Sequence, residues 1–163
     1  SMFCTAAVAA LCFVATYAEP VFSEEEADII ASYTLLDKKF TDENKRLIEN
    51  GGSIPRKELI AQLDANIDTL PADEQDVARQ FNNLFHLKEE ALKAKIDEKI
   101  GTLSAGAQEV AKQMVALIDD TKLSLNQYDE QSKAAYDAAP QAIKDELKAA
   151  NIEFGFEKKT AAA

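Results

Sequence analysis

The sequence predicts an all-α protein, and three observations support this fold class. The 163-residue chain has only 5 Gly and 4 Pro, which leaves little material for the tight turns between strands. No run of alternating apolar and polar residues is long enough for a strand, whereas helix-start signals recur along the whole chain. We therefore expect a compact bundle of about five to seven helices with one long central helix, after a cleavable signal segment.

Residues 2–18 form an apolar stretch without a single charge, ending in Thr16-Tyr17-Ala18. The stretch is shorter than the ~20 residues that a membrane span needs, and small residues occupy the positions that a signal peptidase reads. It predicts a secretory signal peptide over residues 1–18, with Ser1 as an addition ahead of Met2. The alternative is a buried N-terminal helix.

Both cysteines, Cys4 and Cys12, lie inside this predicted signal peptide. A mature chain without them could form neither disulfides nor zinc–thiolate sites, so its stability would come from helix packing. The prediction is therefore a secreted, extracellular protein without cysteine chemistry.

Two helices are expected in the segment 19–52. Ser23-Glu24-Glu25-Glu26 reads as a capping box and predicts a first helix through Leu35. Thr41-Asp42-Glu43 predicts the start of a short second helix, which Gly51-Gly52 ends. This segment precedes the main predicted domain, 53–155.

The main domain is expected to begin with a helix from Ser53 to Leu70, with Pro55 in its first turn. The longest helix is predicted over 71–100, because apolar residues recur there in steps of about four. These are Val77, Phe81, Leu84, Phe85, Leu92, Ile96 and Ile100.

Three further start signals divide the remainder of the chain. Ser104 and Ser124 are predicted to cap one helix each, and Pro140 is predicted to open a last helix over 141–150. The tail 156–163 is charged and alanine-rich, and we expect it to be frayed.

One internal repeat is visible in the sequence. The segment 70–80 aligns with 103–113 at an offset of 33 residues (103 − 70), with Leu, Ala, Gln, Val, Ala and Gln identical. Two copies are too few for a solenoid. Duplication and two helices with similar start signals remain equally good interpretations.

Charge and composition exclude several function classes. The formal net charge of −11 disfavours nucleic acid, whose affinity for proteins depends on Lys and Arg, and we expect no stable membrane insertion after signal cleavage. His86 is the only His, and we interpret it as a helical surface or core residue and not as a general base. No nucleophile motif or phosphate-binding loop is present, so we expect no catalytic residue, no enzyme activity and no cofactor-binding site.

One acidic segment suggests weak cation binding. Asp64-Ala65-Asn66-Ile67-Asp68 has the spacing that opens a calcium loop, but Thr69 and Gln75 replace the Gly and Glu that such a loop requires. Asp64 and Asp68 are therefore candidate ligands for weakly bound Mg²⁺ or Ca²⁺. The alternative is a solvated acidic surface.

A stripe of large apolar side chains has two readings. It could line a fatty-acid or retinoid cavity, or it could be ordinary core, which such stripes more often are. Its members are Phe81, Leu84, Phe85, Met114 and Leu117.

Two segments resemble the nematode SXP/RAL-2 family of secreted antigens. The first is Leu63-Asp64-Ala65-Asn66-Ile67-Asp68-Thr69-Leu70 with the Lys/Glu-rich helix after it. The second is Leu123-Ser124-Leu125-Asn126-Gln127 followed by residues 136–147, where Ala139 replaces the usual Leu and Ile143 stands for Val. The resemblance covers residues 54–152.

The resemblance implies a small helical protein that a parasitic nematode releases or carries at its surface. It implies an allergen-like, non-enzymatic antigen that meets host immune components or another host or parasite protein. Divalent-cation binding, suggested for the family, would fall on Asp64 and Asp68 here. A carrier of a lipid ligand is the alternative function, and the residues do not separate it from an interaction antigen.

Overall fold

The fold is all-α, as predicted, and a computed structural model describes residues 22–154, with the exception of the Phe85 side chain. Within this range there are eight α-helices and two short 3₁₀-helices, and no named strand. The predicted signal segment, both cysteines and the predicted frayed tail lie outside the described residues. The α-helices are α2 (Glu24–Tyr33), α3 (Lys38–Asn50), α4 (Arg56–Ile67), α5 (Ala72–Asn82), α6 (Leu84–Lys99), α7 (Ala105–Asp119), α8 (Leu125–Ala138) and α9 (Gln141–Ala149).

Four helix starts follow the sequence signals. Ser23 and Ser124 each form a complete capping box, and Ser104 accepts a hydrogen bond from the Ala107 N–H. Pro140 immediately precedes α9. In each serine cap the hydroxyl oxygen satisfies a backbone N–H that has no partner within the helix.

Two predicted starts are wrong in position. The second helix begins at Lys38, because the Asp37 carboxylate accepts hydrogen bonds from the N–H groups of Lys39 and Phe40. The third begins at Arg56, and Ser53 belongs to the 3₁₀-helix η1 (Gly51–Ser53). In the second case the rigid ring of Pro55 sets the start of the helix.

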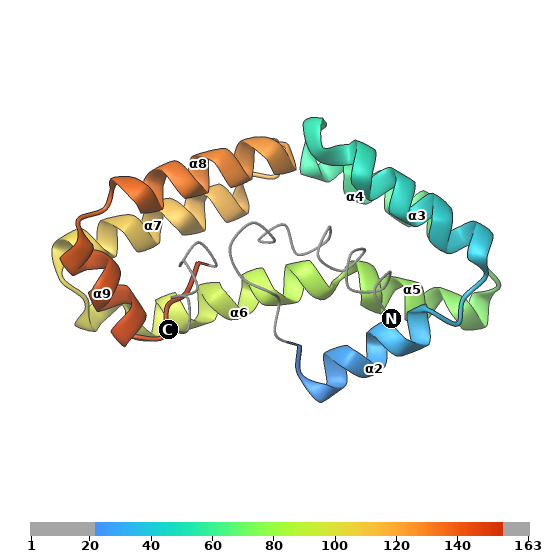
Figure 1. Cartoon of the computed structure of the whole chain (residues 1–163), viewed down its shortest axis with the longest axis horizontal. Helices are drawn as coiled ribbons and strands as arrows, with labels where there is room; N and C mark the ends of the chain where they lie inside the picture. The colour runs from blue at the N-terminus through green and yellow to red at the C-terminus, as the bar shows by residue number, and fades with distance from the viewer. Residues whose placement is uncertain (1–21, 155–163) are drawn as a thin grey trace, which may run out of the picture.

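The predicted long helix over 71–100 is present as α5 and α6, which lie almost in line along one side of the molecule (Figure 1). Asn83 joins them. Its N–H donates to the Arg79 carbonyl at 2.9 Å, and its carbonyl accepts from the Leu87 N–H at 3.0 Å. Helical hydrogen bonds thus continue across the joint, so the two helices act as one central connector.

Two three-helix units face this connector. The first comprises α3, α4 and α5, and the second comprises α7, α8 and α9 (Figure 1). Equivalent bounds are related by 69 positions (124 − 55): α3 and α7 end at Asn50 and Asp119, and α5 and α9 begin at Ala72 and Gln141. The sequence analysis missed this repeat because few residues are identical at that offset.

The two units meet through an antiparallel bridge between Pro55 and Ser124. The Arg56 N–H donates to the Leu123 carbonyl at 3.0 Å, and the Lys57 N–H donates to the Thr121 carbonyl at 3.1 Å. The loop before α4 and the loop before α8 are therefore held together, and the chain closes into a ring (Figure 1).

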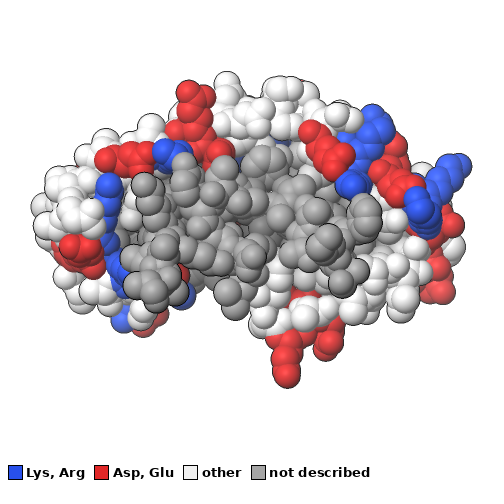
Figure 2. All heavy atoms as spheres, in the orientation of Figure 1, with Lys and Arg blue, Asp and Glu red and all other residues white. Residues whose placement is uncertain are grey.

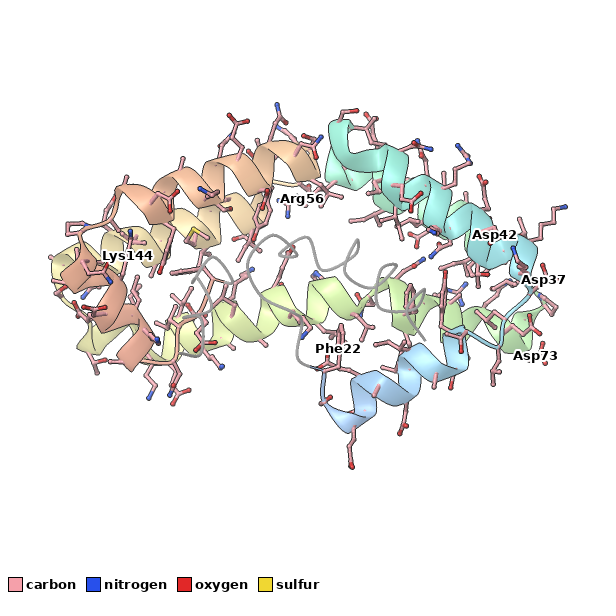
Figure 3. All side chains as sticks on the ribbon, in the orientation of Figure 1. Phe22, Asp37, Asp42, Arg56, Asp73 and Lys144 are labelled. Atoms are coloured by element: carbon pink, nitrogen blue, oxygen red, sulfur yellow. The ribbon has the colours of Figure 1, made fainter. Side chains whose placement is uncertain are left out.

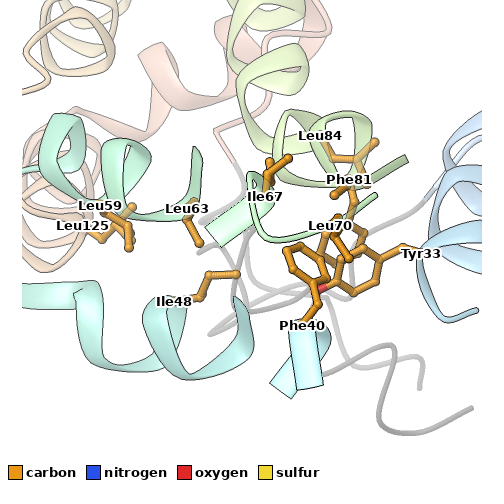
Figure 4. Packing of buried hydrophobic residues seen from close by; sticks show 11 residues of the cluster. Tyr33, Phe40, Ile48, Leu59, Leu63, Ile67, Leu70, Phe81, Leu84 and Leu125 are labelled. Atoms are coloured by element: carbon orange, nitrogen blue, oxygen red, sulfur yellow. The ribbon is translucent and has the colours of Figure 1, made fainter. Parts of the chain in front are cut away.

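Each unit has its own hydrophobic core. In the first, the Tyr33 and Phe81 rings stack with centroids 3.5 Å apart, and Phe40 packs against Tyr33 edge-on (Figure 4). The core of the second unit contains Ile96, Ala107, Ala111, Met114, Leu147, Ile152 and Phe154.

The repeat at an offset of 33 residues has a structural counterpart. The Gln75 amide donates to the Leu70 carbonyl at 3.0 Å, and the Gln108 amide donates to the Leu103 carbonyl at 3.0 Å. Ala78 and Ala111 are both fully buried. The two segments therefore build the same local structure, in which a glutamine side chain fastens the turn ahead of α5 and α7.

Candidate ligand cavity

A cavity of about 710 Å³ lies between α4 and the central connector. This volume is within the ~300–1,000 Å³ range of small-molecule sites. Its apolar wall comes from α3, α4, α8 and the end of α7. These side chains are Ile48, Leu59, Ile60, Leu63, Ile118 and Leu125.

Charged side chains complete the wall. Arg56 and Asp64 come from α4, Arg79 from α5, and Glu89 and Glu90 from α6, with Asp119 at the end of α7. His86 also lines the cavity, and it is exposed. The arrangement is that of a binding site for an amphiphile, because an apolar wall borders polar groups that can orient a ligand.

Arg56 is the central residue of this wall, at the place where α4 meets the end of α7 (Figure 3). Its side chain is 6% exposed. One guanidinium nitrogen, Nη2, donates to the carbonyls of Leu117, Ile118 and Asp120 at 2.8, 3.0 and 2.9 Å. The positive charge therefore sits at the negative end of the α7 dipole and satisfies carbonyls that have no partner within that helix.

Two more groups enclose the Arg56 guanidinium. The Tyr128 ring of α8 lies beneath it, 4.6 Å from centroid to guanidinium carbon, and Glu89 of α6 faces it with Nη1–Oε1 at 3.4 Å. Burial raises the pKa of the Tyr128 hydroxyl to about 12. Arg56 thus connects α4, α6, α7 and α8.

Glu89 is a carboxyl held mostly out of water, with 11% of its side chain exposed. Burial raises its pKa to about 7, because the charged form loses hydration, and nearby Glu90 and Asp119 add to the increase. Arg56 and Lys93 act in the opposite direction. At neutral pH this carboxyl therefore exchanges its proton readily at the cavity wall.

The sequence analysis missed both Arg56 and Glu89. One weak signal was present for Arg56: a cation in the first turn of a helix opposes the helix dipole, so it must find compensation elsewhere. Glu89 had no signal, since it is one of many acidic residues on a Lys/Glu-rich helix.

The predicted apolar pocket residues are not brought together. Phe81 and Leu84 belong to the core of the first unit, whereas Met114 belongs to the core of the second and Leu117 packs against it. None of these four lines the cavity, and the Phe85 side chain lies outside the description. For these four the core reading fits, and the cavity has a different wall.

The predicted cation ligands lie on one helix, as expected. Asp64 is exposed on α4 and lines the cavity, and Asp68 is the exposed C-terminal cap of the same helix. Among residues 22–154 there is no group of three or more His, Cys, Asp or Glu side chains placed to hold a metal ion. Cation binding at this pair stays a prediction.

The outer surface is dominated by acidic side chains on the face in Figure 2, with a group over α2 at the lower edge. The first turn of α2 contributes Glu24, Glu25 and Glu26. Within the described range, every helix is too short or too polar to cross a membrane. Comparisons with protein-family models, curated proteins and solved structures find no match for this chain.

Proposed function

We propose that this protein is a secreted, non-enzymatic carrier of a small, largely apolar ligand, which it holds in the central cavity. The observation that supports the proposal is the 710 Å³ cavity with six aliphatic side chains in its wall. Protein interiors are otherwise close-packed and leave few voids larger than a water molecule. A bound apolar ligand would restore contacts that the wall of an empty cavity lacks.

The size and polarity of the wall fit an amphiphile better than a fully apolar molecule. The aliphatic side chains of α3 and α4 can cover a hydrocarbon chain, and the charged side chains of α5 and α6 can contact a polar head group. Of the two functions that the sequence left open, the cavity favours the carrier over the interaction antigen.

Secretion and the nematode antigen resemblance remain part of the proposal and rest on the sequence. The Leu123–Gln127 motif of the resemblance forms the loop and capping box that pair with the start of α4. Expression of the full chain in secreting cells, followed by N-terminal sequencing of the released protein, tests this part. The expected N-terminus is Glu19, and retention in the cells would contradict secretion.

The carrier proposal is tested with two tryptophan variants of exposed apolar residues. Ile60→Trp places a bulky ring in the cavity wall, where Ile60 is 52% exposed, whereas Leu35→Trp changes a residue that is 87% exposed and outside the cavity. We expect dodecanol, followed by displacement of a fluorescent apolar dye, to bind the parent and Leu35→Trp equally and Ile60→Trp about tenfold more weakly.

Circular dichroism and thermal unfolding of both variants provide the control for folding. Equal affinity of the two variants for dodecanol would show that the cavity is not the binding site. Failure of the parent protein to bind any probe would contradict the carrier function itself.

A further inference from the structure

The positive side chains at the cavity wall are already occupied by protein acceptors. Arg56 donates to three main-chain carbonyls and faces Glu89. Arg79 donates from Nη2 to the Gln75 side-chain oxygen at 2.9 Å, and its Nη1 lies 3.5 Å from the Asp76 carboxylate. Neither guanidinium can turn toward a ligand without giving up these bonds, which would leave polar groups unpaired.

The negative side chains are more numerous and less occupied. Four carboxyls line the cavity: Asp64, Glu89, Glu90 and Asp119. Glu90 and Asp119 share one lysine, Lys93, whose Nζ lies 3.6 and 2.7 Å from them. Among the described residues, no hydrogen bond or ion pair engages the exposed Asp64 carboxylate.

We propose that the ligand carries a cationic amine head group, which the carboxyls of Asp64 and Glu89 receive at the polar side of the cavity. This inference rests on the proposed carrier function and specifies its ligand. A carboxylate or phosphate head group would meet like charges and donors that are already used, whereas an ammonium group would meet acceptors. The fatty-acid alternative therefore gives way to a long-chain amine.

Glu89 couples this binding to pH. An ammonium group close to Glu89 stabilises the charged carboxylate, so a proton leaves as the ligand arrives. The groups facing Glu89 are Arg56 from α4, Glu90 and Lys93 from α6, Asp119 from α7 and Tyr128 from α8. Of these and Glu89 itself, the carboxyl of Glu89 is the group whose pKa is raised to about 7. Amine affinity should therefore rise between about pH 6 and about pH 8.

Three probes with the same hydrocarbon chain isolate the head group. Dodecylamine, dodecanol and dodecanoate are titrated into the purified full chain by dye displacement at low salt. We expect dodecylamine to bind about tenfold more tightly than dodecanoate, with dodecanol between them. High salt should narrow this difference, since the Asp64 end of the site is exposed to water.

Two matched aspartate variants locate the effect. Asp64→Asn removes a charge at the cavity wall, and Asp68→Asn removes the same charge one helical turn away, outside the wall. The preference for the amine should shrink about threefold in Asp64→Asn and stay unchanged in Asp68→Asn. Equal effects in both variants would reduce the preference to the overall charge of the protein and overturn the proposed site.

Glu89→Gln keeps the size and the hydrogen-bond acceptor but cannot titrate, so it should flatten the pH dependence of dodecylamine affinity. His86→Gln is the control, because His86 lines the same cavity. If His86→Gln flattens the profile and Glu89→Gln does not, the role of Glu89 is wrong.

The remaining outcomes separate the two proposals. Equal binding of all three probes, or tighter binding of dodecanoate, overturns the amine preference and leaves the carrier function standing. No binding of any probe contradicts both.

Discussion

The two three-helix units share their helix bounds but fill their cores differently. The first packs large aromatic rings from α2, α3 and α5 around a buried amide, Asn44. The second brings α7 close to its neighbours through small residues, among them Ala107 and Ala111. One backbone arrangement thus holds two different packing solutions, which shows that the helix bounds, more than the core composition, define the unit.

The units are also covered differently. Helix α2 closes the first core with Tyr33. The second is closed by residues after α9, where Asn151 adopts φ 59 and the Ile152 N–H returns to the Leu147 carbonyl at 2.9 Å. This turn ends the helix and directs Ile152 and Phe154 into the core. Each unit therefore depends on a segment that the other lacks.

The largest expected effect concerns the junction of the units. Arg56→Ala leaves Glu89 buried beside unpaired carbonyls of α7, and we expect it to lower the free energy of unfolding by about 3–5 kcal/mol. Chemical denaturation measures the loss. Lys57→Ala is the control, since that side chain is exposed and only its backbone N–H contributes to the pairing. A loss below about 1 kcal/mol for Arg56→Ala would mean that the units are held together by the backbone pairing and the cores alone.

The second prediction exchanges the two core solutions. Met114 occupies the place in α7 that Asn44 occupies in α3, four residues after one buried apolar side chain and four before another. Asn44 exchanges hydrogen bonds with Asn82 and donates to the Tyr33 hydroxyl. Met114→Asn buries an amide without such partners, so we expect a loss of about 2–4 kcal/mol by denaturation.

Met114→Leu is the volume-conserving control and should cost less than about 1.5 kcal/mol. If Met114→Asn is as mild as Met114→Leu, the second core tolerates polar groups and the contrast between the units is weaker than the packing indicates.

The third prediction concerns pH and sets the junction against the second unit. Because the pKa of Glu89 is raised, its contribution to stability is present at acid pH and is lost as the pH rises to about 7. One proton limits the slope to about 1.4 kcal/mol per pH unit. Glu146 of α9 behaves oppositely, because hydrogen bonds from the Ser104 side chain and N–H lower its pKa. Its contribution is lost as the pH falls.

Urea unfolding across this pH range should therefore show a smaller loss of stability toward neutral pH in Glu89→Gln than in the parent. Glu146→Gln should lose less stability than the parent on the acid side. Parallel curves for Glu89→Gln and the parent would contradict a raised pKa at the junction.

The smallest expected effect tests the repeat at an offset of 33 residues. Gln75→Ala and Gln108→Ala each remove one side-chain hydrogen bond to a turn carbonyl, so each should cost about 0.5–1.5 kcal/mol. Because the two contacts are equivalent, the two losses should agree within about 0.5 kcal/mol. A clear difference between them would favour two helices with merely similar starts over a duplicated element.

Local features were predictable from the sequence, and distant ones were not. Ser104 and Ser124 cap helices through atoms three residues away, so their signals are short-range and reliable. Helical periodicity identified the buried face that includes Phe81, but it does not say which helix that face meets. Arg56 and Glu89 are 33 residues apart, and no local pattern connects them. The cavity depends on that connection, which is why its wall was missed.

The bridge between Pro55 and Ser124 has a consequence for the order of folding. Pairing these residues closes a loop of 69 residues (124 − 55), which costs about 4 kcal/mol of chain entropy by the logarithmic loop law. The turns fastened by Gln75 and Gln108 close only short segments and require no such search. We expect the two units to form first and the ring to close last. The amide hydrogens of Arg56 and Lys57 would then become protected against solvent exchange after those inside the helices.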